Sequence, residues 1–253
     1  MLPLVLTLLL PWVSAYIPER TEEKIIGGQT CVPHSQPWQA AQFVLKNFHC
    51  GVFLVSNQWA LTAAHCNHWN LRVVLGKHNI YQEEPFQQSI RVKCRVTHPK
   101  YSSRNLKNDL MLLYLENLGN LTPQVGPIQL AEACATPRTA CQVSGWGTIS
   151  SPFVKYPSNL QCAEVSILSM AKCNKSLPLY GITPGVMCAG TERGGKDACP
   201  GDSGGPLVCN GTLQGIVSWG MERCGLARYH GVYTNLCLYR TWILKEMQKQ
   251  KKQ

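Results

Sequence analysis

The string Gly201-Asp202-Ser203-Gly204-Gly205-Pro206 carries the clearest chemistry in this sequence. A serine hydroxyl becomes a good nucleophile only when a neighbouring base takes its proton. The carbonyl that it attacks becomes an oxyanion, which needs hydrogen-bond donors fixed in advance. Glycines on both sides of Ser203 let the backbone approach a substrate closely and point N–H groups at it. The string therefore predicts nucleophilic attack by Ser203 rather than a structural glycine-rich turn.

A base and an orienting carboxylate are expected elsewhere in the chain, because a serine nucleophile works with both. His65, one of seven histidines, ends an apolar run and precedes Cys66, which would hold its ring rigidly. Asp109 is one of only three aspartates and heads an apolar segment, where a carboxylate is costly unless it is hydrogen-bonded or paired. We expect His65 to be the base and Asp109 its partner. The alternatives are a packed core histidine and a strand-capping aspartate.

Short strands must position these residues. Apolar or alternating runs bounded by turn residues predict strands at residues 42–45, 71–75, 110–115, 207–209, 215–219 and 231–234. Many short strands separated by glycine and proline predict an all-β barrel or sandwich, and a length of 253 residues suits one large domain or two small ones. One long helix is expected from Leu238 onward, where Trp242, Ile243 and Met247 recur at helical spacing.

The first residues predict a secreted protein. Residues 2–13 are almost continuously apolar, and small residues follow, so we expect a signal peptide over residues 1–15. No other apolar run is long enough to span a membrane. Thirteen cysteines on a secretory route imply a disulfide framework with one thiol left over. Three sequons predict N-glycosylation at Asn120, Asn174 and Asn210.

The formal net charge of +10 predicts acidic partners such as sulfated glycans or anionic membranes. Four lysines between Lys245 and Lys252 either belong to such a basic patch or form a solvated helix end. No nucleic-acid-binding motif accompanies the charge, so we expect no nucleic acid partner. The spacing of His65, Cys66 and His68 fits no common zinc motif, and we expect no metal and no other cofactor.

In this chain order, His65, Asp109 and Ser203 resemble the triad of the chymotrypsin-fold serine proteases. Strings similar to that family cover nearly the whole mature chain: Ile25–Gly28, Leu61–Cys66, Ser144–Gly147, Gly201–Pro206 and Ser218–Gly220. Residues 33–40 are especially similar to the kallikrein-related branch. The resemblance implies a trypsin-like serine endopeptidase in which Ser203 is the nucleophile, His65 the general base and Asp109 the group that orients the imidazole.

The same resemblance implies the architecture. It predicts an all-β peptidase domain over residues 25–253, built from two six-stranded antiparallel β-barrels with the active site in the cleft between them. The first barrel would span about 25–130, and the second, with a C-terminal α-helix, about 131–253. The backbone N–H groups of Gly201 and Ser203 would form the oxyanion hole. The residues implied to bind substrate are Asp197, Ser218, Trp219, Gly220 and Gly231.

The resemblance also implies roles in specificity and activation for two further aspartates. Asp197 would lie at the floor of the primary pocket, where a buried anion is neutralised by a substrate Arg or Lys. We therefore expect cleavage after Arg or Lys; a solvent-exposed loop aspartate is the alternative. Asp202 would pair with a new ammonium group formed by cleavage between Lys24 and Ile25, which makes residues 16–24 a propeptide. Because that cut follows a lysine, self-activation is compatible with the expected specificity.

Six disulfide bonds are implied by the resemblance. They would join Cys31 to Cys162, Cys50 to Cys66, Cys134 to Cys237, Cys141 to Cys209, Cys173 to Cys188 and Cys199 to Cys224. Cys94 remains, either as a buried free thiol or as a partner of another molecule. Lys77 and Gln87 stand where calcium-binding relatives carry glutamates, so no calcium site is expected. Further departures from the family pattern leave the extended subsite preferences open: Val52, Pro200, His230 and the insertion-like segment Met221–Arg223.

The sequence is compatible with three hypotheses for the class of function: an enzyme, a binding protein, and an inhibitor or structural protein. The first is a secreted, monomeric endopeptidase that acts on proteins or peptides with Arg or Lys before the scissile bond and that meets secreted serine-protease inhibitors. The second is a non-catalytic protease homologue that binds glycans or receptors through a basic surface. The third is a secreted inhibitor or structural disulfide-rich protein. The complete triad and the Ile25–Gly28 string favour the first hypothesis, because neither of the others requires them.

Overall fold

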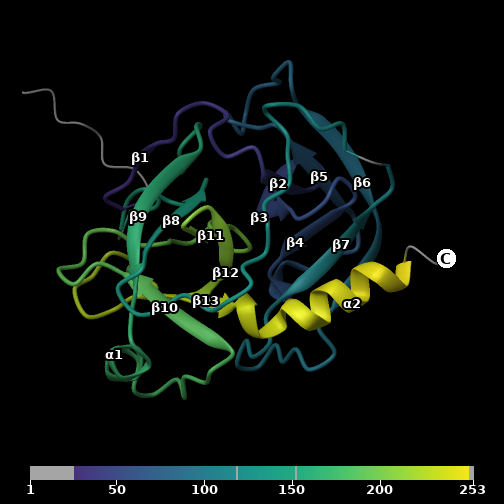
Figure 1. Cartoon of the computed structure of the whole chain (residues 1–253). Coiled ribbons are helices and arrows are strands. Elements are labelled where there is room, and N and C mark those ends of the chain that lie inside the picture. Colours follow the sequence, from purple (N-terminus) through teal and green to yellow (C-terminus); the bar gives the residue numbers. More distant parts are fainter. Residues whose placement is uncertain (1–25, 118, 152, 251–253) are drawn as a thin grey trace, which may run out of the picture.

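The computed structural model describes residues 26–117, 119–151 and 153–250. The expected signal peptide, the propeptide and the cut between Lys24 and Ile25 therefore lie outside the described residues. Two β-barrels stand side by side, and a C-terminal helix lies across the lower side of the first (Figure 1). Within the described part of the chain, no helix has both the length and the apolar character needed to cross a membrane.

Six antiparallel strands close the first barrel in the order β2-β3-β4-β7-β6-β5. Their bounds are β2 (Gln39–Val44), β3 (Asn47–Leu54), β4 (Trp59–Thr62), β5 (Leu71–Leu75), β6 (Gln88–Thr97) and β7 (Met111–Leu115). Alternate side chains fill the interior, as the period of a strand requires. In β6, Ile90 is buried inside the barrel while Arg91 and Lys93 are exposed.

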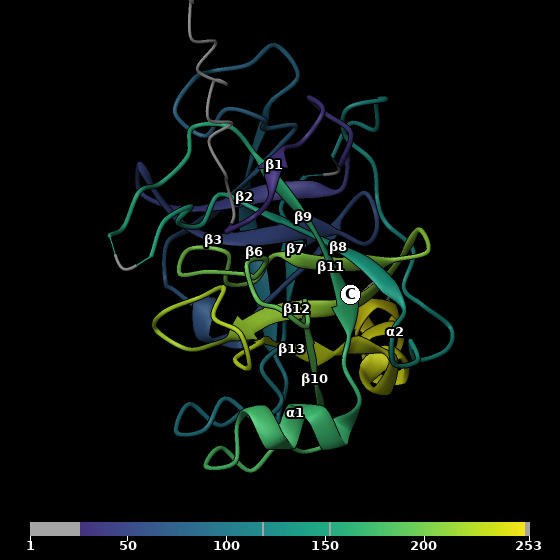
Figure 2. The ribbon, with the colours of Figure 1, turned by 90° about the vertical axis from the view of Figure 1, so that its left-hand side faces the viewer.

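The second barrel closes in the order β8-β9-β10-β13-β12-β11, because β8 pairs with both β9 and β11. Its strands are β8 (Ala140–Gly145), β9 (Gln161–Ile167), β10 (Val186–Gly190), β11 (Pro206–Cys209), β12 (Thr212–Trp219) and β13 (Gly231–Asn235). The short strand β1 (Gln29–Thr30) adds to β9, as Figure 2 shows. Two closed six-stranded antiparallel barrels confirm the predicted fold.

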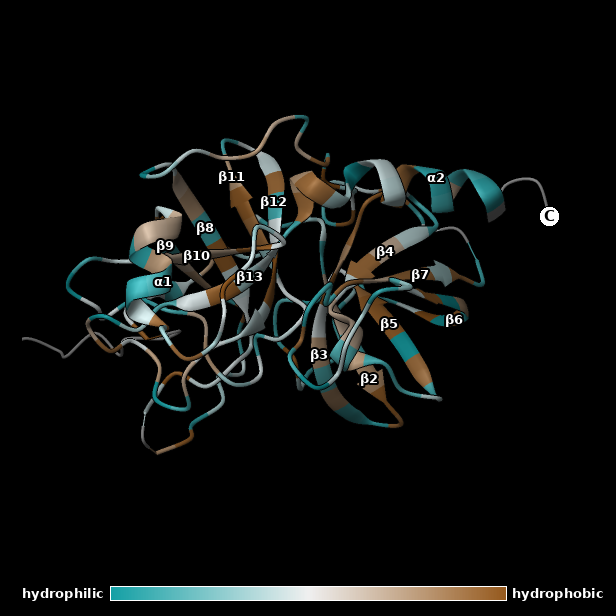
Figure 3. Ribbon diagram, turned by 90° about the horizontal axis from the view of Figure 1, so that it is seen from below, coloured by the Kyte–Doolittle hydropathy of each residue, from teal (hydrophilic) through white to brown (hydrophobic). Residues whose placement is uncertain are grey.

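A shared core joins the barrels. Leu61 and Leu112 of the first barrel belong to the same buried cluster as Ile216 of the second. The C-terminal helix α2 (Arg240–Gln250) adds the buried Ile243 to this cluster and is preceded by the 3₁₀ turn η2 (Leu236–Tyr239). The outer end of α2 is polar (Figure 3). The helix expected from Leu238 is thus present and begins two residues later.

A second helix, α1 (Met170–Ser176), is absent from the sequence predictions. It projects below β10 in Figure 2, and the Cys173–Cys188 bond ties it to that strand. The hydroxyl oxygen of Ser169 caps its first turn by accepting the Lys172 N–H at 3.2 Å. Seven residues are too few for the hydrophobic period of a helix to stand out in the sequence.

Six disulfide bonds connect the cysteines in the pairing that the family resemblance implies. Cys31–Cys162 attaches the segment after β1 to the second barrel, across 131 residues of sequence. Cys50–Cys66 fixes the turn that carries His65 against β3. Among the described residues, Cys94 is the free cysteine, and it is half-buried in β6.

Candidate active site

Antiparallel pairing of β4 and β7 brings two of the predicted site residues together. Thr62, the last residue of β4, lies opposite Met111, the first residue of β7. His65 follows β4 in the 3₁₀ turn η1 (Ala64–Cys66), and Asp109 precedes β7 by two residues. Both residues therefore stand at the same end of the strand pair.

The Asp109 carboxylate is completely buried and fully engaged. Its Oδ1 accepts the backbone N–H of His65 at 2.9 Å, and its Oδ2 lies 2.7 Å from His65 Nδ1. The Ser218 hydroxyl donates to the same Oδ2 at 2.5 Å. The Asp109 carbonyl accepts from the hydroxyl of Thr234 at 2.7 Å. These contacts fix the tautomer of His65, because Nδ1 must carry the proton that it shares with Asp109.

Ser203 comes to this place from the second barrel, in the turn before β11. Its carbonyl accepts the Gly51 N–H at 2.8 Å, and the Gly204 N–H donates to Val217 O at 2.8 Å. Gly204 has a φ of 78°, and a Cβ there would lie only 2.3 Å from Thr62 Oγ1. Only glycine permits this approach. The turn of Ser203 is thereby pressed against the end of β4, just before His65.

The described hydrogen bonds join His65 to Asp109 and not to Ser203. In ligand-free active sites, the bond between nucleophile and base is often long and shortens only when substrate binds. The three groups predicted to act together are therefore gathered where the two barrels meet, with the carboxylate–imidazole contact already formed.

Two backbone donors are available beside Ser203. Within the described residues, the N–H groups of Gly201 and Ser203 donate to no acceptor, although Asp202 between them donates to Cys199 O at 2.9 Å. Gly201 has a φ of 97°, which a residue with a side chain rarely adopts. Two unused N–H groups on one tight turn can hold an oxygen anion.

Asp197, the residue expected at the floor of a specificity pocket, is a buried carboxyl group. The residue is 5% exposed. Its Oδ2 accepts the Gly225 N–H at 3.1 Å, and its Oδ1 lacks a hydrogen-bond partner among the described residues. Burial raises the pKa of Asp197 to about 7, against the opposing effect of backbone N–H donors. A Cβ on Gly231 would lie 2.8 Å from Oδ1, whereas a Cβ on Gly220 would meet nothing closer than 3.9 Å. Glycine at these positions keeps the approach to the carboxylate open.

Asp202 is also completely buried, and burial raises the pKa of its carboxyl group to about 6. Its two oxygens accept the N–H groups of Gly147 at 2.8 Å and of Cys199 at 2.9 Å. The carbonyl of Ile26 accepts the Asp197 N–H at 3.3 Å, so the first described residue lies beside Asp197. Lys24 and Ile25, the other two residues of the expected activation switch, lie outside the described residues.

The residues considered as metal ligands and glycosylation sites have the following surroundings in the structure. Cys50, His65 and Cys66 place possible ligand atoms within 4.8 Å of one another, but the disulfide bond leaves no thiolate to bind a metal. The Lys77 ammonium group donates to Gln87 Oε1 at 2.9 Å and to the Gln82 carbonyl, which places a cation where calcium would need carboxylates. The three sequon asparagines are exposed: Asn120, Asn174 and Asn210.

Sequence reasoning did not assign the contacts of Ser218 and Thr234 to Asp109. These residues lie 109 and 125 positions away from it, and no local pattern marks such a contact. Two further histidines lie near the site; from the sequence, His68 was considered only as a metal ligand and His49 was not considered. The rings of His49 and His68 lie 5.9 Å apart, and the pKa of His49 is lowered by burial and then by the charges of His68 and His65.

Comparisons with known proteins agree with this geometry. The family model described as Trypsin matches residues 25–243. The chain is 55% identical to human Kallikrein-14 over 231 residues, which cover 90% of this chain and 86% of the relative. It is 45% identical to mouse Kallikrein-8 over 248 residues, or 97% of this chain and 95% of the relative. The solved structure of neuropsin, described as a serine protease expressed in the limbic system of mouse brain, is 47% identical with a TM-score of 0.83. That match covers 87% of this chain and 98% of neuropsin. The chain therefore belongs to the trypsin family of serine endopeptidases and is related to the kallikreins.

Proposed function

We propose that this protease cleaves peptide bonds after Arg or Lys, through an acyl-enzyme formed on Ser203. The observation that carries the proposal is Asp197, a buried carboxylate with an unpartnered oxygen beside two glycines. An unpaired buried anion is costly, and a guanidinium or ammonium group removes that cost. Arg can donate two hydrogen bonds to the carboxylate, and Lys can reach it as a point charge.

The proposed mechanism assigns one role to each group. Ser203 Oγ attacks the carbonyl carbon of the Arg or Lys residue while His65 Nε2 takes the hydroxyl proton. The N–H groups of Gly201 and Ser203 stabilise the oxyanion, each worth about 3 kcal/mol. The imidazolium then gives its proton to the leaving amine, which departs and leaves an ester on Ser203. Water, deprotonated by His65, hydrolyses that ester and restores the serine. Asp109 keeps the imidazole in the required tautomer throughout.

Substrate backbone is proposed to pair with Ser218, Trp219 and Gly220 at the end of β12. The residue whose side chain enters the Asp197 pocket supplies the carbonyl that is attacked. The preceding residues of the substrate then extend β12 as an added strand, which fixes their register by main-chain hydrogen bonds.

The test is hydrolysis of small amides by mature chain that begins at Ile25. Arg-amide and Lys-amide should be hydrolysed, while Gln-amide of similar size should be a poor substrate. An organophosphonate that esterifies Ser203 should stop the reaction. A correctly oxidised and trimmed sample that hydrolyses neither basic amide would refute the proposal.

Binding of a small arylamidine should depend on pH through Asp197. The cation binds the ionised carboxylate, and the pKa of that carboxyl group in the ligand-free protein is about 7. Affinity should therefore be full above pH 8 and fall about tenfold for each pH unit well below 7. Calorimetric titration between pH 5.5 and 8.5 measures this, and buffers of different ionisation enthalpy should reveal the released proton. An affinity that is constant over this range would contradict the assignment, and the variant Asp197→Asn should bind weakly at every pH.

We further propose that the protease is secreted as a precursor and matures by cleavage between Lys24 and Ile25. The expected signal peptide, the six disulfide bonds and the three exposed sequon asparagines support the secretory route. The buried Asp202 carboxylate, with its raised pKa, would gain a partner in the new ammonium group of Ile25. Secreted serine-protease inhibitors and acidic glycans are proposed as further partners.

Self-activation predicts a specific behaviour of the precursor. Because the activation cut follows a lysine, the wild-type precursor should mature on incubation, and a Ser203→Ala precursor should remain intact. Addition of a trace of wild-type mature chain should then cleave the Ser203→Ala precursor after Lys24. Gel electrophoresis and N-terminal sequencing follow both reactions. Unaided maturation of the Ser203→Ala precursor would show that self-cleavage is not the required route.

A further inference from the structure

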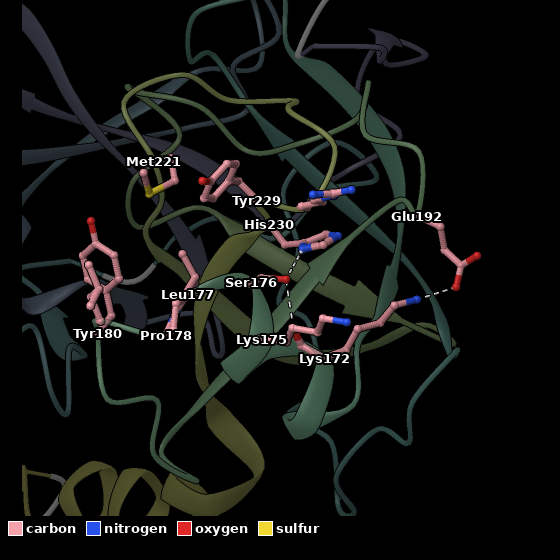
Figure 4. A pocket seen from close by; sticks show the side chains of 12 residues that line it. Lys172, Lys175, Ser176, Leu177, Pro178, Tyr180, Glu192, Met221, Tyr229 and His230 are labelled. Carbon is pink, nitrogen blue, oxygen red and sulfur yellow. Dashed lines mark hydrogen bonds and ion pairs between the residues drawn. The ribbon is translucent and has the colours of Figure 1, made fainter.

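A cavity of about 670 Å³ lies outside the groups used in the proposed chemistry. Leu177, Pro178 and Tyr180, which follow α1, form one side of it together with Met221, which follows β12 (Figure 4). Tyr229 completes this apolar wall. Tyr180 and Tyr229 are substantially exposed, and exposed apolar groups gathered around a hollow mark binding surfaces rather than packing.

The opposite wall carries positive charge. Lys172 and Lys175 project from α1 (Figure 4). Arg228, in the segment before β13, also lines the cavity. Glu192 neutralises Lys172 at 2.5 Å, whereas Lys175 and Arg228 form no ion pair among the described residues. Arg228 also has a φ of 78°, an unfavourable conformation for a residue with a side chain, and such outliers cluster at functional sites. The cavity thus offers an apolar wall together with two cations that have no ion pair within the described part of the chain.

The cavity adjoins the proposed substrate-binding strand. Met221 directly follows Gly220, and the Tyr180 ring packs against Trp219 at a tilt of 35°, with 5.0 Å between centroids. On the other side, His230 directly precedes Gly231, and its buried Nδ1 lies 3.0 Å from the Ser176 hydroxyl at the end of α1. The cavity therefore lies directly beside the two segments that carry Gly220 and Gly231.

A bound substrate would run from that pocket into the cavity. If three residues of substrate pair with Ser218–Gly220, the residues before them pass Met221 and reach the cavity, because an extended chain advances about 3.3 Å per residue. We infer that the cavity binds the substrate segment four to six residues before the cleaved bond. The cavity favours substrates that carry two kinds of side chain in this segment. A carboxylate would pair with Lys175 and Arg228, and a neighbouring aliphatic or aromatic side chain would pack on the apolar wall. This inference rests on the proposed function, whose pocket sets the register.

Matched peptide amides test the inference. Each is eight residues long, ends in Arg before the leaving group and carries Leu with either two Glu or two Gln at the fourth to sixth positions before the cleaved bond. The wild-type mature chain should show a kcat/KM about three- to ten-fold higher for the Glu peptide than for the Gln peptide, the range given by two exposed charge pairs. Variants Lys175→Gln and Arg228→Gln should each reduce this ratio, and their combination should bring it to about one. High salt should reduce it as well.

The control variant is Lys249→Gln on α2, which removes the same charge far from α1 (Figure 1). It should keep the wild-type ratio, and all variants should hydrolyse a short Arg-amide like the wild type. A wild-type ratio near one, or an equal fall of the ratio in Lys249→Gln, would overturn the inference. If the short Arg-amide itself were not hydrolysed, only the proposed function would fail. Anisotropy with labelled peptides and Ser203→Ala protein then decides on the cavity: Lys175-dependent, tighter binding of the Glu peptide supports it, and equal binding overturns it.

Discussion

Replacing Asp197 by serine is expected to lower kcat/KM for Arg- and Lys-amides by about 10⁴-fold or more. The carboxylate is buried, and one of its oxygens has no partner among the described residues, so it is the group that a substrate cation would meet. In the variant, the guanidinium would enter the same pocket without an anion. Leaving such a buried polar group unpaired costs about four to five orders of magnitude in discrimination.

The same variant should keep its reactive serine. Asp197 makes no contact with His65 or Asp109 among the described hydrogen bonds, so an organophosphonate should esterify Ser203 at the wild-type rate. Stability at pH 8 should be unchanged or higher. The pKa of Asp197 is about 7 rather than its ordinary value near 3.8, so its ionisation destabilises the folded state as the pH rises from about 4 to about 7, and this cost is fully present at pH 8. Survival of Arg-amide hydrolysis, or loss of organophosphonate reactivity, would show that Asp197 has another role.

The fold was predictable from the sequence where one strand face is plainly apolar. The expected strand at 71–75 coincides with β5, and β7 begins one residue inside the predicted segment. Strand β2 begins earlier than expected, at Gln39, because Gln39 and Gln42 are polar yet buried. Their amides bond to partners distant in sequence: Gln42 donates to Cys66 O, and Gln39 accepts from Ser144. The alternation of apolar and polar residues along a strand does not identify polar residues that are buried in the core.

The site was predictable to the extent that its chemistry leaves local strings. The turn around Ser203 needs glycine for physical reasons, because Gly204 touches Thr62 and Gly201 has a positive φ. Closure of the barrels was not predictable from composition or period, and it came from the family resemblance. Contacts such as Ser218 with Asp109 depend on how the two barrels pack against each other, since the two residues belong to different barrels.

Two residues that depart from the family pattern also show what the sequence could and could not predict. Met221 and His230 made the extended subsites uncertain in the sequence, and both line the cavity beside the proposed substrate strand. A departure from the family pattern indicates that a subsite differs, but it does not show the shape of that subsite. The walls of the cavity come from α1 and from the segments after β12 and before β13, which only the fold brings together. The proposed preference for acidic substrate residues thus required the structure.

Replacing Asp109 by asparagine is expected to lower kcat for Arg-amides by about 10⁴-fold at neutral pH, the effect of losing the orienting carboxylate in triads of this type. Asp109 Oδ2 accepts from both His65 Nδ1 and the Ser218 hydroxyl, so it holds the proton of the imidazole on Nδ1. An asparagine amide can donate to Nδ1 instead and thus favour the tautomer that carries its proton on Nε2. That tautomer cannot accept the proton of Ser203.

A matched variant separates this effect from a general loss of packing. Ser218→Ala removes one donor to the same carboxylate oxygen but leaves the carboxylate–imidazole contact, so kcat should fall by no more than about tenfold. Arylamidine binding at the Asp197 pocket should be unchanged in both variants, because the pocket floor shares no hydrogen bond with Asp109 among the described residues. Steady-state kinetics with an Arg-amide and calorimetry with the amidine provide the two readouts. If Asp109→Asn retained kcat within tenfold of wild type, His65 would not depend on this carboxylate for its tautomer.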